Sequence, residues 1–187
     1  SLPVPKPSPL EITVCPSLLK SRPMDLLIQK ASELGVAAVQ PYTSSRSVVH
    51  LEGKRLEGRL RHWGEIARNA AKQADRAVPA RVDPPVEFDA LLARWRDRDA
   101  SKVILWESEE SCDLKGFLRR EGKAGTVAAV VGPEGGFHPD EVCAAGKAGF
   151  SPVSLGKRIL RAETAVLAVA ALLQYEWGDL SLESPGG

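Results

Sequence analysis

The chain has 187 residues, 43% hydrophobic and 26% charged, and its 25 Lys and Arg nearly balance its 24 Asp and Glu, for a net charge of +1. This is the composition of an ordinary globular domain with its own core, and the charge argues against a protein that coats nucleic acid, although not against a local basic patch. No apolar run approaches the roughly 18 to 20 residues that cross a bilayer, and the three cysteines match neither a disulfide framework nor a zinc site. We therefore expect a cytoplasmic protein that uses neither a membrane nor a metal.

The chain opens with a proline-rich lead, which holds five of the 14 prolines within its first 16 residues. Such a segment is extended and semi-rigid. Residues 1–9 are therefore predicted to be a linker, and residues 10–180 the compact domain. The last residues, 181–187, read SLESPGG and are predicted to be a flexible tail.

Strands and helices are predicted to alternate along the compact domain. In chain order, the pattern predicts strand 10–14, helix 23–34 ending at Gly35, strands 37–40 and 47–49, helix 54–76, strand 80–82, helix 90–96, strand 103–106, helix 114–120, strand 126–131, helix 139–147, strand 152–155 and helix 163–175. Helix 54–76 has a basic outer face, and the last helix is apolar nearly all round, which predicts burial against the sheet or a partner subunit. Apolar strands bounded by helices predict an α/β fold, a mostly parallel sheet with helices on both faces.

A glycine-rich segment, Gly132-Pro133-Glu134-Gly135-Gly136, follows the predicted strand 126–131. Ligands bind at the carboxyl ends of strands in open α/β sheets, and glycines let the backbone approach a ligand closely. The segment matches neither GxGxxG nor a phosphate-binding Walker loop. A turn without a ligand explains these residues equally well.

A second strand-to-helix junction reads LGKRILRAET over residues 155–164. Glu163 and Thr164 could simply complement the helix dipole or cap the helix, and Arg161 could simply pair with Glu134. Considered alone, this segment favours those structural roles over a ligand site.

Basic residues recur at Arg22, at Ser45-Arg46 and at the end of helix 54–76. They could contact phosphates, but solvated helix faces explain them as well. The histidines show neither triad nor metal-ligand spacing, and no nucleophile elbow is present.

Taken in order, the segments MDLLIQKASELGV, SSRSV, WGEIARNAAKQADR, VVGPEGGF and SLGKRILRAETAVLAV resemble one family, the 16S ribosomal RNA uracil-N3 methyltransferases (RsmE type) of the SPOUT superfamily. The resemblance covers roughly residues 10–180. It implies a SPOUT methyltransferase fold with a deep C-terminal trefoil knot, which general topology rules would not propose. It also implies S-adenosyl-L-methionine as the cofactor, a homodimer, and 16S rRNA of the small ribosomal subunit as the partner.

The resemblance also implies which residues form the site. Contacts to the cofactor are expected from the 132–136 loop and from Leu105, Leu155, Gly156, Ile159, Leu160 and Thr164. As catalytic residues, Arg161 would stabilise the uracil anion through its carbonyl oxygens, and Glu163 would orient Arg161 or assist proton removal. Contacts to RNA are expected from Arg22, Arg46, Lys72, Gln73 and Arg76. The family's N-terminal PUA-like domain is expected to be missing, with the proline-rich lead as the remnant of its junction.

Two other functions remain open from the sequence. One is a SPOUT enzyme that methylates the ribose 2′-oxygen of RNA. The other is a non-catalytic RNA-binding or ribosome-assembly protein in which the glycine-rich segment is only a turn.

Overall fold

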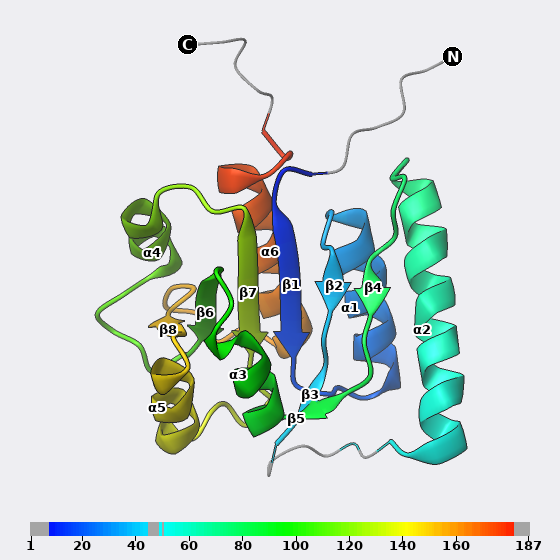
Figure 1. Cartoon of the computed structure of the whole chain (residues 1–187), viewed down its shortest axis with the longest axis horizontal. Helices are drawn as coiled ribbons and strands as arrows, with labels where there is room; N and C mark the ends of the chain where they lie inside the picture. Colours follow the sequence, from blue (N-terminus) through cyan, green and yellow to red (C-terminus); the bar gives the residue numbers. More distant parts are fainter. Residues whose placement is uncertain (1–7, 45–48, 50, 182–187) are drawn as a thin grey trace.

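A central sheet of parallel strands organises the part of the chain that a computed structural model describes, residues 8–44, 49 and 51–181 (Figure 1). Six strands pair in the order β4-β2-β1-β7-β6-β8, and every pairing is parallel. The strands are β1 (Glu11–Pro16), β2 (Ala38–Val39), β4 (Arg81–Val82), β6 (Ser101–Leu105), β7 (Thr126–Val131) and β8 (Ser151–Val153). The helices are α1 (Ser21–Glu33), α2 (Gly53–Gln73), α3 (Phe88–Arg96), α4 (Leu114–Glu121), α5 (Pro139–Lys147) and α6 (Ala162–Trp177).

Helices cover both faces of the sheet, as the sequence predicts. Alternate residues of a strand point to opposite faces, so Ile12 and Val14 of β1 join a core formed with α1 and α6. Cys15 of the same strand joins a second core, formed with α3 and α5. Helix α2 packs on α1 beyond the β4 edge of the sheet (Figure 1). The predicted burial of the last helix is confirmed, because α6 lies against β1, β7 and α1.

The sequence predicted all six helices and misplaced mainly their ends. Helix α1 ends before Gly35, which has φ +85, as expected of a glycine that closes a helix. Helix α2 stops at Gln73 instead of residue 76, because Asp75 adopts φ 51 and turns the chain. Among the described residues, no helix is both long and apolar enough to cross a membrane.

A pair of two-residue strands, β3 (Tyr42–Thr43) and β5 (Val86–Glu87), was not predicted. Pro41 directly precedes β3, and Pro84 and Pro85 directly precede β5, so the sequence indicates turns at these places. The predicted strand 47–49 was wrong at Val49, which lies outside every strand, while residues 47 and 48 fall outside the described part. Arg46, the lead up to residue 7 and the tail from residue 182 also fall outside it.

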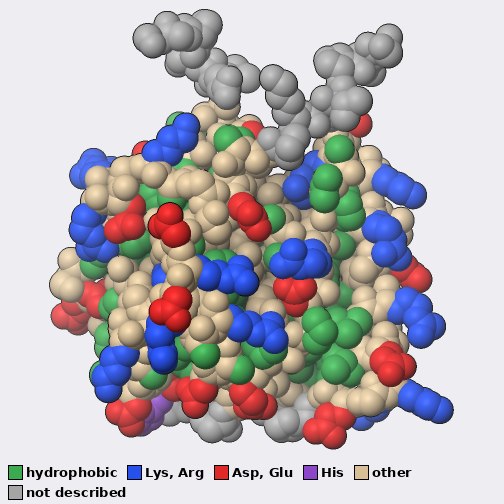
Figure 2. All heavy atoms as spheres, in the orientation of Figure 1, with side chains coloured by type: hydrophobic (Ala, Val, Ile, Leu, Met, Phe, Trp, Pro, Cys, Tyr) green, Lys and Arg blue, Asp and Glu red, His purple; other side chains and the backbone are tan. Residues whose placement is uncertain are grey.

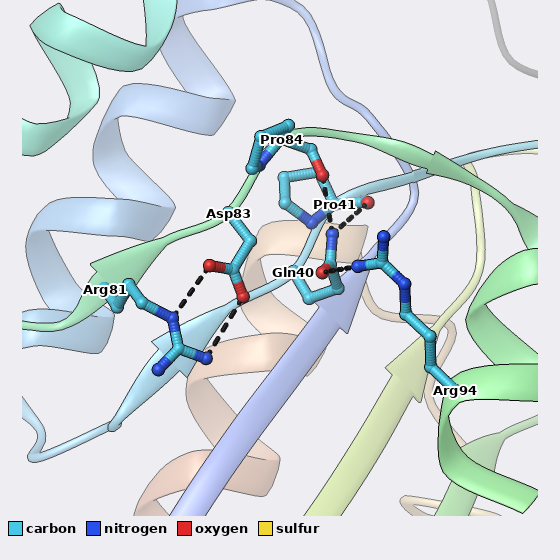
Figure 3. Close-up of polar contacts among 6 residues, drawn as sticks. All are labelled: Gln40, Pro41, Arg81, Asp83, Pro84 and Arg94. Carbon is cyan, nitrogen blue, oxygen red and sulfur yellow. Dashed lines mark hydrogen bonds and ion pairs between the residues drawn. The ribbon is translucent and has the colours of Figure 1, made fainter.

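The side chain of Gln40 fixes the position of β3 (Figure 3). Its Nε2 donates to the carbonyl oxygen of Pro84 at 2.7 Å and to that of Pro41 at 3.1 Å, and its Oε1 accepts from Arg94 of α3 at 2.9 Å. Gln40 is buried and its amide cannot bond to water. These three hydrogen bonds replace the ones that it would make to solvent. The network ties the segment before β3 to the segment before β5.

Candidate active site

A cavity of about 460 Å³ lies at the carboxyl ends of β6, β7 and β8. Its walls come from the loops that follow these three strands and from the first turns of α6. The volume falls in the range of small-molecule sites, and the position is the one where open parallel sheets bind ligands. We refer to this cavity as the active-site pocket.

The glycine loop forms one wall of the active-site pocket. The backbone N–H of Gly136 donates to the carbonyl oxygen of Pro133 at 2.9 Å, and Gly136 has φ +69, a conformation that favours glycine. A Cβ atom on Gly136 would overlap Oε1 of Glu107, and one on Gly132 would lie 3.0 Å from the ring of Phe137. The backbone therefore comes close to neighbouring side chains at both ends of the loop.

Three aromatic side chains, Tyr42, Phe88 and Phe137, pack together and hold the glycine loop at its two ends. The hydroxyl of Tyr42, on β3, donates to the carbonyl oxygen of Val131 at 3.0 Å, and the backbone N–H of Ser17 donates to the same oxygen at 3.0 Å. The Tyr42 ring stacks on Phe137 with centroids 6.5 Å apart and lies 5.1 Å from Phe88. Burial raises the pKa of the Tyr42 hydroxyl well above its usual value, so the hydroxyl remains a donor.

The segment after β8 forms the opposite wall. Ser154 pairs with the β6–α4 connection, since its N–H donates to Cys112 O at 2.9 Å and its carbonyl accepts from Leu114 N at 3.0 Å. The Ser154 hydroxyl also accepts from the N–H of Gly156, whose φ is +99. Beyond this turn, Ile159 is 90% exposed. An isoleucine so exposed beside a cavity offers apolar surface to a ligand.

Charged side chains of both signs line the active-site pocket: Arg158, Arg161, Glu107 and Glu134. Arg161 is the exposed N-cap residue of α6 and makes no side-chain capping bond. Arg161 and Glu134 both lie in the described part, and no ion pair joins them. The structure therefore does not support the structural role that the sequence left open for Arg161.

Most of the predicted site residues come together in this pocket. Those that line it are Leu105, Gly132, Pro133, Glu134, Gly136, Leu155, Gly156, Ile159, Leu160 and Arg161. Gly135, Glu163 and Thr164 are neighbours of lining residues in the chain but do not line the pocket themselves. The other seven lining residues were not among the predicted site residues: Trp106, Glu107, Val131, Ser154, Arg158, Ala162 and Ala165. The acidic residue directly after strand 103–106 was the signal that could have identified Glu107.

The four predicted RNA contacts that the structure describes lie at opposite ends of the α1–α2 pair. Arg22 lies in the first turn of α1, whereas exposed Lys72 and Gln73 lie in the last turn of α2. The guanidinium of Arg76 donates to the carbonyl oxygen of Ser32 near the end of α1, and burial lowers its pKa. Since α1 spans most of the distance, Arg22 and Arg76 lie roughly 15 Å apart along the helix axis.

Two further observations concern a buried thiol and possible metal ligands. Burial, with a smaller contribution from Asp83, raises the pKa of the Cys15 thiol, so Cys15 is not a nucleophile. Among the described residues, no group of three or more His, Cys, Asp or Glu side chains could hold a metal ion.

Residues 6–174 match the family model of the RNA methyltransferase domain. The chain belongs to this family. It is 33% identical to the ribosomal RNA small subunit methyltransferase E of Bacillus subtilis, over 90% of this chain and 67% of that protein. It is also 33% identical to the Mycobacterium bovis enzyme of the same name, over 89% of this chain and 64% of the relative. The chain therefore spans only part of the curated methyltransferases that it matches.

Solved structures of such methyltransferases share the fold. The small subunit methyltransferase E of Neisseria gonorrhoeae, bound to S-adenosylmethionine, superimposes with a TM-score of 0.83 at 38% identity, over 94% of this chain and 70% of that one. A Legionella pneumophila methyltransferase in complex with the same cofactor gives 0.82 at 31% identity, over 92% and 69%. A TrmH/SpoU tRNA-modifying enzyme of Aquifex aeolicus, at 17% identity and a TM-score of 0.51, shows likeness in fold alone.

Proposed function

We propose that this chain is the catalytic domain of an S-adenosyl-L-methionine-dependent methyltransferase that methylates N3 of a uridine in 16S rRNA of the small ribosomal subunit. The observation that carries the proposal is the active-site pocket, because it gathers ten predicted residues from three separate loops at the carboxyl edge. The relatives named above support the same activity. Acting on ribosomal subunits, the protein would work in the cytoplasm.

The residues of the pocket fit this cofactor. Leu105, Leu155 and Leu160 offer apolar surface for a purine ring, and the turns at Gly136 and Gly156 expose backbone near it. The carboxylate of Glu107 offers acceptors for hydroxyl or amino groups. When bound, S-adenosylmethionine supplies an electrophilic methyl group on its sulfonium.

Arg161 and Glu163 would prepare the uracil. The N3 atom carries a proton and becomes nucleophilic only when that proton leaves. The guanidinium of Arg161 would donate hydrogen bonds to the carbonyl oxygens O2 and O4, which stabilises the anion. Glu163, in the first turn of α6, would orient Arg161 or accept the proton. Alignment of the two reactants could lower the barrier by as much as ~7–11 kcal/mol.

The same proposal includes a trefoil knot. Strand β8 lies at the sheet edge, yet the chain continues from it into α6, which packs against β1 and β7 in the middle of the sheet. Ser154, at the start of this crossing, is bonded to the β6–α4 connection. This path supports passage of the C-terminal segment through the loop between β6 and β7.

The proposal also includes a homodimer. One side of α6 is buried, while Leu172 and Tyr175 on the same helix are 46% and 62% exposed. Large apolar side chains exposed next to each other are typical of an interface. A second copy of the chain packed there would cover these two side chains.

Calorimetric titration of S-adenosylmethionine into the chain, followed by transfer assays on unmodified small ribosomal subunits, tests the proposal. We expect micromolar binding, and N3-methyluridine after nuclease digestion and mass spectrometry. A methylated ribose would instead assign the chain to the ribose 2′-O enzymes. Absence of cofactor binding would overturn the methyltransferase and favour an RNA-binding or assembly protein.

A further inference from the structure

A second pocket lies at the same edge of the sheet, between the N-termini of α1 and α2. It has a volume of about 390 Å³, and its apolar floor includes Leu19, Leu51 and Trp63. Four cationic side chains surround that floor: Lys20, Lys54, Arg55 and Arg59. We refer to this second cavity as the basic pocket.

The charged side chains that line the basic pocket are all cationic, while Asp25 lies behind Arg59 and Glu52 is the N-cap residue of α2. No acidic side chain belongs to its described lining, and neither α1 nor α2 has an acidic residue in its first turn or a side-chain cap. Cations near a helix N-terminus are electrostatically unfavourable. By contrast, α5 begins with a capping box and with Asp140 and Glu141. An anion in the basic pocket would compensate the excess positive charge.

One of the four cations is already held in place. Arg59 lies 3.4 Å from Oδ1 of Asp25 and its guanidinium lies 5.4 Å from the centroid of the Trp63 ring. Asp25 also accepts from the indole N–H of Trp63 at 3.1 Å, so the three residues form one unit between α1 and α2. A guanidinium fixed in this way loses little conformational entropy when it binds a phosphate.

The basic pocket is a neighbour of the active-site pocket. The N–H of Ser17 donates to the carbonyl oxygen of Val131, which lines the active-site pocket, and Leu19, two residues after Ser17, lines the basic pocket. From Ser17 to Lys20 the chain can reach at most about 11 Å. A ligand with repeating negative charges could therefore occupy both pockets.

We propose that the basic pocket binds the phosphodiester backbone of RNA beside the nucleotide in the active-site pocket. The proposal rests on the proposed function, which supplies the RNA, and it assigns the backbone contacts to residues other than Arg22, Lys72, Gln73 and Arg76. Lysine and arginine contacts to phosphates position an RNA without reading its sequence. Lys and Arg side chains also extend along the outer edge at α2 (Figure 2), which provides a matched control on the same helix.

The test compares Lys54→Gln/Arg55→Gln with the control Arg61→Gln/Arg68→Gln, which removes the same charge from exposed positions of α2 outside the basic pocket. RNA affinity is measured by fluorescence anisotropy with a fragment of small-subunit rRNA at several salt concentrations. We expect the pocket variant to bind roughly tenfold more weakly, with the slope of log K against log salt reduced by about 1 to 2. The control should keep both values, and all proteins should bind S-adenosylmethionine equally.

The outcomes separate this proposal from the proposed function. A pocket variant with the wild-type affinity and slope would overturn the assignment, and so would equal losses in both variants, since total charge alone would then matter. If the wild-type chain methylates subunits and the pocket variant does so with an unchanged KM, only the basic pocket is refuted. If RNA binding depends on the pocket but no methyl group is transferred, the proposed function fails and the pocket stands.

Discussion

The two pockets at the carboxyl edge of the sheet are lined by different kinds of chemical groups. The active-site pocket is built largely from the backbone of tight turns and from apolar side chains, whereas the basic pocket is surrounded by long cationic side chains on two helices. A site built from backbone depends on the path of the chain, so a single added Cβ atom can damage it. A site built from flexible side chains tolerates single substitutions but responds to salt. The expected effects of mutations in the two regions differ accordingly.

The largest effect is expected at Arg161. Arg161→Gln removes the fixed charge beside the developing anion, so the methyl-transfer rate should fall roughly 10²- to 10³-fold. Affinity for S-adenosylmethionine, measured by calorimetry, should change little. Lys157→Gln, on the same loop but outside the pocket lining, should remain within about twofold of wild type. A similar loss in both variants would argue against a specific role for Arg161.

A smaller effect is expected at Gly136, where φ is +69 and a Cβ atom would displace the carboxylate of Glu107. Gly136→Ala should introduce strain of about 1–2 kcal/mol and weaken cofactor binding about tenfold. The control is Gly146→Ala in α5, where a Cβ would meet nothing within 4 Å. That variant should match or slightly exceed the wild type in thermal stability. Unchanged cofactor affinity in Gly136→Ala would show that the loop can relax.

In the α1–α2 pair, the residue to change is Asp25, because it bonds to both Arg59 and Trp63. Asp25→Ala leaves the N–H of Trp63 without its acceptor inside the core, so the free energy of unfolding should fall by about 1–3 kcal/mol in urea denaturation. Glu65→Ala on the exposed side of α2 should change it by less than about 0.5 kcal/mol. Cofactor affinity of the folded protein should be unaffected by either change. A weaker cofactor complex in Asp25→Ala would mean that the two regions are coupled.

The smallest effect is expected at Tyr42. Tyr42→Phe removes the hydroxyl that donates to Val131, but that carbonyl still accepts from Ser17. The free energy of unfolding should therefore fall by only about 0.5–1.5 kcal/mol. Because the hydroxyl also holds the start of the glycine loop, cofactor affinity should weaken about two- to threefold. Equal cofactor affinity in Tyr42→Phe and the wild type would show that Tyr42 supports the core and not the loop.

Much of the fold and most of the active-site pocket could be predicted from sequence, because their signals are local. The apolar run of β7 and the glycines that follow it are contiguous, and so is the LGKRILRAET junction. The errors occurred where signals were short or distant. Tyr42 belongs to a two-residue strand, and its partner Val131 lies 89 positions away in the chain. The predicted role of Arg76 as an RNA contact stays untested, although its guanidinium bonds to Ser32.

The sequence alone determined the α/β class, the family and the identity of most pocket residues, since hydrophobic periodicity and contiguous motifs depend on neighbours in the chain. Only the tertiary structure decided that Glu107 lies against Gly136, that Tyr42 holds the start of the glycine loop, and that Lys20 shares a pocket with Arg55 and Arg59. Those relations depend on the order of strands in the sheet and on the packing of α1 against α2. Both are set by long-range burial of apolar surface, which no local pattern encodes.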